Sequence, residues 1–387
     1  FPVLVPRVQE SSVPAPANEK VRVGFDATSL LGQRTGIGHV SAAIVERLSV
    51  DPSLELRAFA VSWRGRRELA EAVPAGVHTS SRPFPARLAR RTWPRFGRPR
   101  TEYWTGPVDV VHAPNFVAPP TKAPLLLTIH DLTFHRFPEM CTPDVLTFDA
   151  HIRRSLAAGA LVHATTDFVK SEVQDVYGLP DDRVVRIYTG PLPIHQGDPA
   201  AGRRLAGAER YLVSLGTIEP RKNLPRLVAA FDAIAGDRPD LALVVAGPDG
   251  WGQQDYAAAV DAAHHRDRIV RLGYITYDQR ADLLAGATAL AYPSIYEGFG
   301  FPPLEAMGVG IPVVASDSSA LPESLGDAAL LPDPLDIDSI AEALARVVDD
   351  EALRTTLVSR GRRRATRYSW DDTAAELATL YRRLAAG

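Results

Sequence analysis

The stretch that decides the fold reads Tyr292-Pro-Ser-Ile-Tyr-Glu297-Gly298-Phe299-Gly300-Phe301-Pro302-Pro303-Leu304-Glu305-Ala306-Met307-Gly308. A buried strand is expected to end near Tyr292, and Pro302-Pro303 suit the first turn of a following helix, where no backbone N–H is required. Glu297 then lies at the carboxyl end of the strand and Glu305 lies one turn into the helix. Both carboxylates can face one ligand site, to which the glycine-rich turn and the helix N-terminus offer N–H groups. The alternative is a surface acid at 305 that complements the helix dipole and an ordinary loop acid at 297.

Short apolar runs alternate with helical patterns on both sides of this stretch. The expected strands are 21–25, 54–61, 108–111, 125–129, 160–164 and 184–187 in a first series, and 211–215, 241–246, 269–272, 289–292, 312–315 and 328–331 in a second. Apolar strands separated by helices indicate parallel sheets buried on both faces. Two series predict two doubly wound, Rossmann-like α/β domains, with ligands bound beyond the carboxyl ends of the strands.

The chain divides into four expected segments. Residues 1–20 are proline-rich and lack the features of a signal peptide, so we expect a disordered leader. Residues 21–190 form the first domain, and residues 191–368 form the second. Residues 369–387 form a last helix that we expect to pack back on the first domain, with Ser369 as its N-cap.

Composition excludes several classes of protein. The chain has 387 residues, a net charge of −3 and one cysteine, Cys141. A broadly basic nucleic-acid binder, a disulfide scaffold and a multi-cysteine zinc site are therefore excluded, and no apolar run reaches the roughly 20 residues of a membrane span. A single free cysteine fits a cytoplasmic location. Only four of the 43 basic residues are lysines, which draws attention to Lys222.

Lys222 belongs to the segment Glu219-Pro220-Arg221-Lys222-Asn223, which follows the expected strand 211–215. A lysine and an arginine at a strand-to-helix turn suit a diphosphate, because lysine supplies a concentrated charge and arginine a planar fork. A solvated basic turn is the alternative.

These two segments resemble the retaining glycosyltransferases of family 4, whose signature is two glutamates separated by seven residues, here Glu297 and Glu305. The resemblance extends from about Val21 onward and is strongest to bacterial O-antigen and polysaccharide mannosyltransferases. It implies the GT-B fold, in which two Rossmann-like domains face each other across a cleft. It also implies transfer of a hexose from a nucleotide sugar to a hydroxyl with retention of configuration and without a metal ion.

The resemblance assigns roles to residues of this chain. Glu297 lies against the transferred sugar, Glu305 binds the ribose hydroxyls, and Arg221 and Lys222 neutralise the leaving diphosphate. Gly36 and Gly38, on a glycine turn after strand 21–25, close over the diphosphate from the other domain. The remaining residues expected to bind the donor are Tyr274, Gly298, Phe299, Gly300, Phe301 and Leu304.

Histidines after two strands of the first domain are further candidates. His130, in the run Thr128-Ile129-His130-Asp131, is interpreted as a catalytic-site residue that orients the substrate. His112 is a weaker candidate, for which a structural role is the favoured alternative, and His163 is expected to have no role in substrate binding or catalysis. No Asp-x-Asp cluster stands at a strand end, so we predict no metal and no cofactor besides the nucleotide-sugar substrate.

Residues 82–100 contain seven arginines, three aromatic residues and no acid. Arginines among aromatics can bind an anionic membrane surface or an anionic glycan, and we expect this segment to dock a polyprenyl-diphosphate-linked acceptor at the inner face of the plasma membrane. Its four prolines argue against a regular amphipathic helix. A mobile, solvated loop is the alternative.

The donor is the least determined part of the prediction. GDP-mannose is favoured by the resemblance, with UDP-glucose or another UDP-sugar as the alternative. Two other functions remain open at this point: a non-catalytic sugar-nucleotide-binding partner in a polysaccharide assembly complex, and a nucleotide-sugar epimerase of the same fold.

Overall fold

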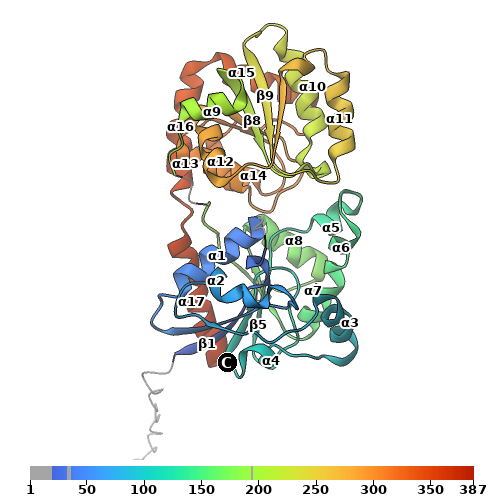
Figure 1. Cartoon of the computed structure of the whole chain (residues 1–387), viewed down its shortest axis with the longest axis vertical. Coiled ribbons are helices and arrows are strands. Elements are labelled where there is room, and N and C mark those ends of the chain that lie inside the picture. The colour runs from blue at the N-terminus through green and yellow to red at the C-terminus, as the bar shows by residue number, and fades with distance from the viewer. Residues whose placement is uncertain (1–19, 33–35, 193–194) are drawn as a thin grey trace, which may run out of the picture.

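The computed structural model describes residues 20–32, 36–192 and 195–387, so the predicted leader up to residue 19 lies outside the described residues. Two sheets stacked along the long axis of the molecule form its framework, each covered by helices (Figure 1).

All strand pairs in the described part of the chain are parallel. The first sheet has the order β3-β2-β1-β4-β5-β6-β7 and consists of β1 Val21–Asp26, β2 Leu54–Phe59, β3 His78–Thr79, β4 Val110–Ala113, β5 Leu125–Ile129, β6 Leu161–Ala164 and β7 Val184–Arg186. The second has the order β10-β9-β8-β11-β12 and consists of β8 Arg210–Leu215, β9 Leu241–Ala246, β10 Ile269–Gly273, β11 Ala289–Tyr292 and β12 Val313–Ala315.

Helices connect the strands. Those of the first half are α1 Gly36–Leu48, α2 Leu69–Ala72, α3 Ala86–Phe96, α4 Glu102–Thr105, α5 Thr133–Arg136, α6 Pro143–Leu146, α7 Phe148–Ala157 and α8 Asp167–Tyr177. Those of the second half are α9 Pro199–Ala206, α10 Leu224–Ala235, α11 Gln253–Ala262, α12 Tyr277–Gly286, α13 Phe301–Val309, α14 Leu321–Leu325, α15 Ile337–Asp349, α16 Glu351–Ala365 and α17 Trp370–Ala386.

The central strands are apolar on both faces because helices cover both faces. The cluster that contains Val23 and Phe25 of β1 includes residues of α1 and α17, whereas Leu127 and Ile129 of β5 pack with residues of α7 and α8. In the second sheet, residues of α10 and α15 pack on one face and residues of α12 and α13 on the other. This two-sided burial is the physical reason for the continuous apolar runs in the sequence.

Each sheet has a point at which the strand order reverses, between β1 and β4 in the first and between β8 and β11 in the second. Ligands of doubly wound sheets bind beyond the strands at this point. The segments that follow β6 and β11 contact each other, since the hydroxyl of Thr166 donates to the carbonyl of Gly298 at 3.0 Å. The carboxyl ends of the two sheets therefore face one another.

The last helix, α17, leaves the second half and packs against α1 and the first sheet (Figure 1). Beside it, the chain passes from the first half to the second, and the indole N–H of Trp370 donates to the carbonyl of Pro191 at 2.8 Å. A Cβ on Gly190 would lie within 2.6 Å of the Trp370 ring. Glycine at this hinge therefore permits the two crossing segments to touch, while the domain boundary near residue 190 stays a prediction.

The predicted fold class is confirmed, with local differences that include the unpredicted edge strand β3. Residues 86–96 form the regular helix α3, against the expectation from its prolines. Pro85 is the N-cap and Pro94 lies in the last turn, so neither disrupts the centre of the helix. Burial of Ala89 and Trp93 stabilises this helix on the first domain. Segment 328–331, expected as a strand, makes only an isolated bridge between Leu330 and Val314.

Candidate active site

Glu297 is the centre of a buried polar cluster beyond β8 and β11. Its carboxylate accepts hydrogen bonds from Lys222 Nζ at 2.6 Å and from the Tyr292 hydroxyl at 2.9 Å, both at Oε1. Arg221 Nη1 lies 2.8 Å from its other oxygen, Oε2. The backbone N–H of Glu297 donates to the Ser319 hydroxyl at 2.9 Å, which fixes the loop. The two predicted motifs thus meet in space, although they lie 75 residues apart in the chain.

The cations of this cluster come from the turn after β8. A short 3-10 helix, Pro220–Lys222, ends at Asn223, which adopts a left-handed conformation with φ of 60°. Asn223 is buried and its amide group donates to the carbonyls of Pro293 and Pro334, so this residue ties the turn to the segment after β11. Arg221 is held from its other side by Glu219, at 2.9 Å.

The electrostatics of the cluster keep the Glu297 carboxyl ionised. Burial raises the pKa of the Glu297 carboxyl, but the charges of Arg221 and Lys222 outweigh it and hold that pKa at about 2. Burial and the nearby guanidinium of Arg221 lower the pKa of Lys222. Burial and the charge of Glu297 raise the pKa of Tyr292, which therefore keeps its proton and can donate it to Glu297 in a hydrogen bond.

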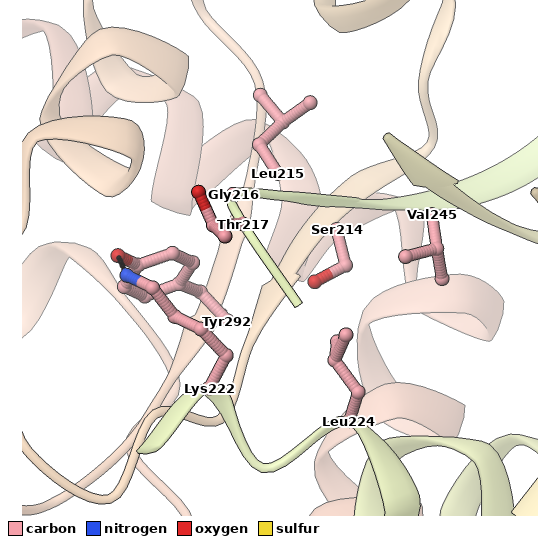
Figure 2. Close-up of a pocket in the computed structure, with 8 residues that line it drawn as sticks. All are labelled: Ser214, Leu215, Gly216, Thr217, Lys222, Leu224, Val245 and Tyr292. Atoms are coloured by element: carbon pink, nitrogen blue, oxygen red, sulfur yellow. Dashed lines mark hydrogen bonds between the residues drawn. The ribbon is translucent and has the colours of Figure 1, made fainter. Parts of the chain in front are cut away.

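A narrow pocket opens beside Lys222 at the switch point. It is lined by Ser214, Leu215, Gly216, Thr217, Lys222, Leu224, Val245 and Tyr292. Figure 2 shows the polar ends of Lys222 and Tyr292 in contact beneath the backbone of Gly216 and Thr217. The lining comes from the ends of β8, β9 and β11, so the pocket has the position expected of a ligand site in a doubly wound sheet.

Glu305 lies on α13, which begins after Gly300 in a left-handed conformation with φ of 93°. Its Oε2 accepts from the Nε of Arg280 at 2.8 Å, and a second guanidinium N–H contacts the same oxygen. Its Oε1 is buried without a hydrogen-bond partner within the described part of the chain. A buried carboxylate oxygen of this kind is costly unless a ligand or water donates to it, so Glu305 has a free acceptor for a hydroxyl group.

Two side chains between the glutamates, Phe299 and Leu304, pack into the core. Phe299 packs edge-on against Tyr368 in the core, and Leu304 is fully buried. A Cβ on Gly298 would lie 1.7 Å from the carbonyl oxygen of His130. Only glycine permits the two halves of the molecule to approach this closely at position 298.

The carbonyl of His130, in the first half, lies against Gly298, the residue that follows Glu297. Its Nε2 lies 2.8 Å from the carbonyl oxygen of Pro114, so Nε2 carries a proton and donates it. Burial lowers the pKa of His130, and the neutral ring then leaves Nδ1 as an acceptor. Asp131, by contrast, accepts from the N–H and hydroxyl of Thr133 and caps a turn.

Two further predicted regions are the start of α1 and the segment after β10. Gly36 and Gly38 stand in the first turn of α1, where Gly36 is exposed and Gly38 is buried. Residues 33–35 of the same loop lie outside the described residues. Tyr274 follows β10 with 61% of its side chain exposed, and its contact with a nucleobase stays a prediction.

Arg280 and Tyr292 also belong to this site, although the sequence patterns did not predict them. Tyr292 was predictable in principle, because a polar group at the last position of a buried strand lies at the end of the sheet where ligands bind. Arg280 was not, since its partner Glu305 lies on another helix.

His112 and His163 are buried structural residues of the first sheet. Both are fully buried and flank Thr128, whose hydroxyl lies 2.8 Å from His112 Nε2 and 2.9 Å from His163 Nδ1. His163 Nε2 can only donate to the carbonyl of Ile187, at 2.9 Å. Burial lowers the pKa of each histidine, so both rings are neutral. The hydrogen bonds that join His112, Thr128, His163 and Ile187 form one row. Because His163 donates to Ile187, Thr128 donates to His163 and His112 donates to Thr128.

Within the described ranges, no three His, Cys, Asp or Glu side chains are arranged to hold a metal ion, and metal independence stays a prediction. Searched over the same ranges, the helices include none that is long and apolar enough to cross a bilayer.

Comparison with known proteins identifies two matching family models. Residues 201–364 match the model of the glycosyl transferases group 1, and residues 47–190 match that of Glycosyltransferase Family 4. The O-antigen chain mannosyltransferase B of Escherichia coli is 29% identical over 283 residues, which span 71% of this chain and 74% of the relative.

Solved structures share the fold. Sucrose-phosphate synthase from Thermosynechococcus elongatus superposes with a TM-score of 0.72 at 20% identity, over 95% of this chain and 100% of that one. HepE of Anabaena in complex with UDP and glucose gives a TM-score of 0.70 at 18% identity, over 93% and 99%. The chain therefore carries a Glycosyltransferase Family 4 domain followed by a glycosyl transferases group 1 domain, and its two parallel sheets have the arrangement of the GT-B glycosyltransferases.

Proposed function

We propose that the protein transfers a hexose from a nucleoside diphosphate sugar to a hydroxyl group, with retention of configuration and without a metal ion. The observation that supports this most is the convergence of Arg221, Lys222 and Glu297 beyond the β8/β11 switch point. Two cations beside an ionised carboxylate match a reaction in which a diphosphate leaves and positive charge develops on the sugar.

Each group has one task in this proposal. Arg221 and Lys222 turn from Glu297 toward the diphosphate and stabilise its charge as the glycosidic bond breaks, aided by backbone N–H groups at Gly36 and Gly38. Glu297 lies against the sugar and stabilises its oxocarbenium-like character. Glu305 accepts from a ribose hydroxyl through its free Oε1. His130 orients the acceptor hydroxyl through Nδ1.

The donor that we propose is GDP-mannose, and the product is part of a cell-surface polysaccharide such as O-antigen. The support is the relative from Escherichia coli, an O-antigen chain mannosyltransferase. A UDP-sugar is the alternative, since HepE, which shares the fold, was solved with UDP and glucose.

Incubation with a panel of GDP- and UDP-sugars, with and without EDTA, tests the proposal through the nucleotide released. One donor should yield nucleotide and free sugar slowly in water, EDTA should change nothing, and Glu297→Ala should abolish release. A donor that is bound but not cleaved would instead identify a non-catalytic partner. Conversion of the sugar without nucleotide release would identify an epimerase.

The acceptor is proposed to be a glycan or a polyprenyl-diphosphate-linked glycan, met at the cytoplasmic face of the membrane. The support is an arginine-rich surface on and beside α3, formed by the exposed residues Arg87, Leu88, Arg90, Arg91, Arg95, Phe96, Arg98 and Arg100. An open cavity of about 660 Å³ adjoins it, with Arg98, Arg100 and Lys122 in its wall. Cations around exposed apolar side chains match an anionic bilayer surface.

Co-sedimentation with vesicles of phosphatidylcholine and phosphatidylglycerol tests the arginine-rich surface. Binding should be lost in high salt and in a triple variant with Arg87, Arg90 and Arg91 changed to Gln. A control with Arg360, Arg363 and Arg367 changed to Gln removes the same charge from exposed positions of α16 and the turn after it, and should still bind. Equal binding of both triple variants would reject this surface as the docking site.

A further inference from the structure

Tyr296 directly precedes Glu297, yet its side chain lies in the other half of the molecule. Only 3% of it is exposed. Its ring stacks edge-on against Phe137 and Phe168, with centroids 5.7 and 5.9 Å apart. Both phenylalanines belong to the half that contains β1 to β7, so the loop after β11 inserts an aromatic anchor across the interface.

The hydroxyl of Tyr296 is held at two points. It accepts from the backbone N–H of Leu132 at 2.9 Å and donates to the carboxylate of Glu172 on α8. Leu132 lies two residues after His130, so the Tyr296 hydroxyl is tied to the loop that carries the proposed acceptor-orienting residue. Glu172 is buried, and its second oxygen accepts from Arg136 Nε at 2.6 Å, which leaves the Tyr296 hydroxyl between fixed partners.

The backbone around Glu297 is held on both sides of it. Before it, the carbonyl of Tyr296 accepts from Arg221 at 3.2 Å, and after it, the carbonyl of Gly298 accepts from Thr166 at 3.0 Å. The side chain of Tyr296 adds the one anchor in this segment that combines two hydrogen bonds with two ring contacts across the interface. Displacement of that anchor would move the Glu297 carboxylate directly, since the two residues share a peptide bond.

We infer that Tyr296 is a positioning residue, whose hydroxyl sets Glu297 in register with the His130 loop through Glu172 and the N–H of Leu132. The inference rests on the proposed function, because it takes Glu297 as the residue that faces the sugar. Tyr296 touches neither substrate nor reacting atoms, and it acts only through the placement of its neighbour.

The test is the Tyr296→Phe variant, which keeps the ring and removes the hydroxyl. Donor contacts remain on Arg221, Lys222 and Glu305, so the donor KM should stay within about twofold of the wild type, while kcat for nucleotide release should fall about tenfold or more. The matched control is Tyr211→Phe, which removes a buried hydroxyl that donates to the Leu283 carbonyl at 2.6 Å, at the start of β8 and away from the site. Tyr211→Phe should lower the free energy of unfolding by a similar amount and keep the kcat of the wild type. A wild-type kcat in Tyr296→Phe would overturn the inference.

A second readout does not need activity. Spin labels at cysteines introduced in place of the exposed Arg91 and Asp255, in a Cys141→Ser background, report the distance between the halves. Tyr296→Phe should add a population at longer distance, and Tyr211→Phe should not; identical distributions in both would overturn the inference. If Tyr296→Phe does not fold, Glu172→Gln removes the charged partner of the same hydroxyl and should give the same split between kcat and KM. If the wild type releases nucleotide from none of the donors, the proposed function fails. The distances between the spin labels still test whether Tyr296 holds the two halves together.

Discussion

The hydroxyl of Tyr381, on the last helix, lies 2.6 Å from Nδ1 of His112 on β4, a residue 269 positions earlier in the chain. Because the His112 ring is neutral and its Nε2 donates to Thr128, Nδ1 is the acceptor and Tyr381 is the donor. The row therefore runs from Tyr381 through His112, Thr128 and His163 to the carbonyl of Ile187 without a break. It fastens α17 to the first sheet by hydrogen bonds as well as by apolar contacts.

Tyr381→Phe should destabilise the protein by about 1–3 kcal/mol, because it leaves the buried Nδ1 of His112 without a donor. Urea unfolding followed by tryptophan fluorescence measures the change. Tyr103→Phe, a change at a 39% exposed tyrosine, is the control and should alter stability far less. Equal effects from the two changes would contradict a structural role for the row.

Acid should weaken the same row. Burial lowers the pKa of His163 from 6.5 to about 4 and also lowers that of His112. Histidines of the unfolded chain take up protons below pH 6.5, whereas the native His163 ring stays neutral down to about pH 4. The free energy of unfolding therefore falls as pH drops below 6.5, by roughly 2 kcal/mol for His163 at pH 5, and His112 acts in the same direction. Unfolding in urea at pH 7, 6 and 5 should show this fall, and a flat profile would speak against it.

Asp26 should oppose that trend. Burial raises its pKa from 3.8 to about 6, so the native carboxyl holds a proton that the unfolded one has released, and its contribution to stability fades as pH rises through 6. Asp26→Asn cannot titrate, and the decline of stability between pH 7 and pH 5 should become steeper in this variant. A shallower decline of stability in this variant would contradict a raised pKa for Asp26.

Gly298→Ala should block the approach of the two halves. The added Cβ would lie 1.7 Å from the His130 carbonyl oxygen, so the molecule must open at this point. We expect kcat/KM to fall by about a hundredfold, since a displacement of about 1 Å at the site suffices for that loss. Gly308→Ala on the same segment is the control, because its Cβ would meet no atom within 4 Å. Similar kinetics for the two variants would rule out the steric explanation.

Glu305→Gln should weaken donor binding with a smaller effect on kcat. It removes the charge that Arg280 neutralises and turns one acceptor into an amide donor. The donor KM should rise about tenfold or more, measured by nucleotide release. A normal KM with a reduced kcat would place Glu305 in the chemical step instead.

The sequence was sufficient for the parts of the site that are local. Glu297, Arg221 and Lys222 occupy turns that follow a strand, and Glu305 lies on the helix that follows one of these turns, so local geometry constrains where each side chain lies. The partners of these residues were not predictable in the same way. Arg280 reaches Glu305 from another helix, and Glu172 meets Tyr296 across 124 residues of sequence, so both contacts depend on how finished elements pack.

Helix α3 shows a second reason for failure. The number of prolines does not predict their effect, which depends on position: Pro85 precedes the helix and Pro94 affects only its end. Burial of Trp93 beside Phe59 and Trp104 then outweighs the weak local preference. Tertiary burial of this kind has no signature within the segment.

The return of α17 to the first half has a consequence for biosynthesis. Leu377 and Tyr381 belong to the same apolar cluster as Val23 and Phe25. The core of the first half is therefore incomplete until residues 370–386 have been translated. The half that contains β8 to β12 is continuous in the chain and can complete its own core earlier. Although domains generally fold in the order in which the ribosome delivers them, here the half that begins first is the one that finishes last.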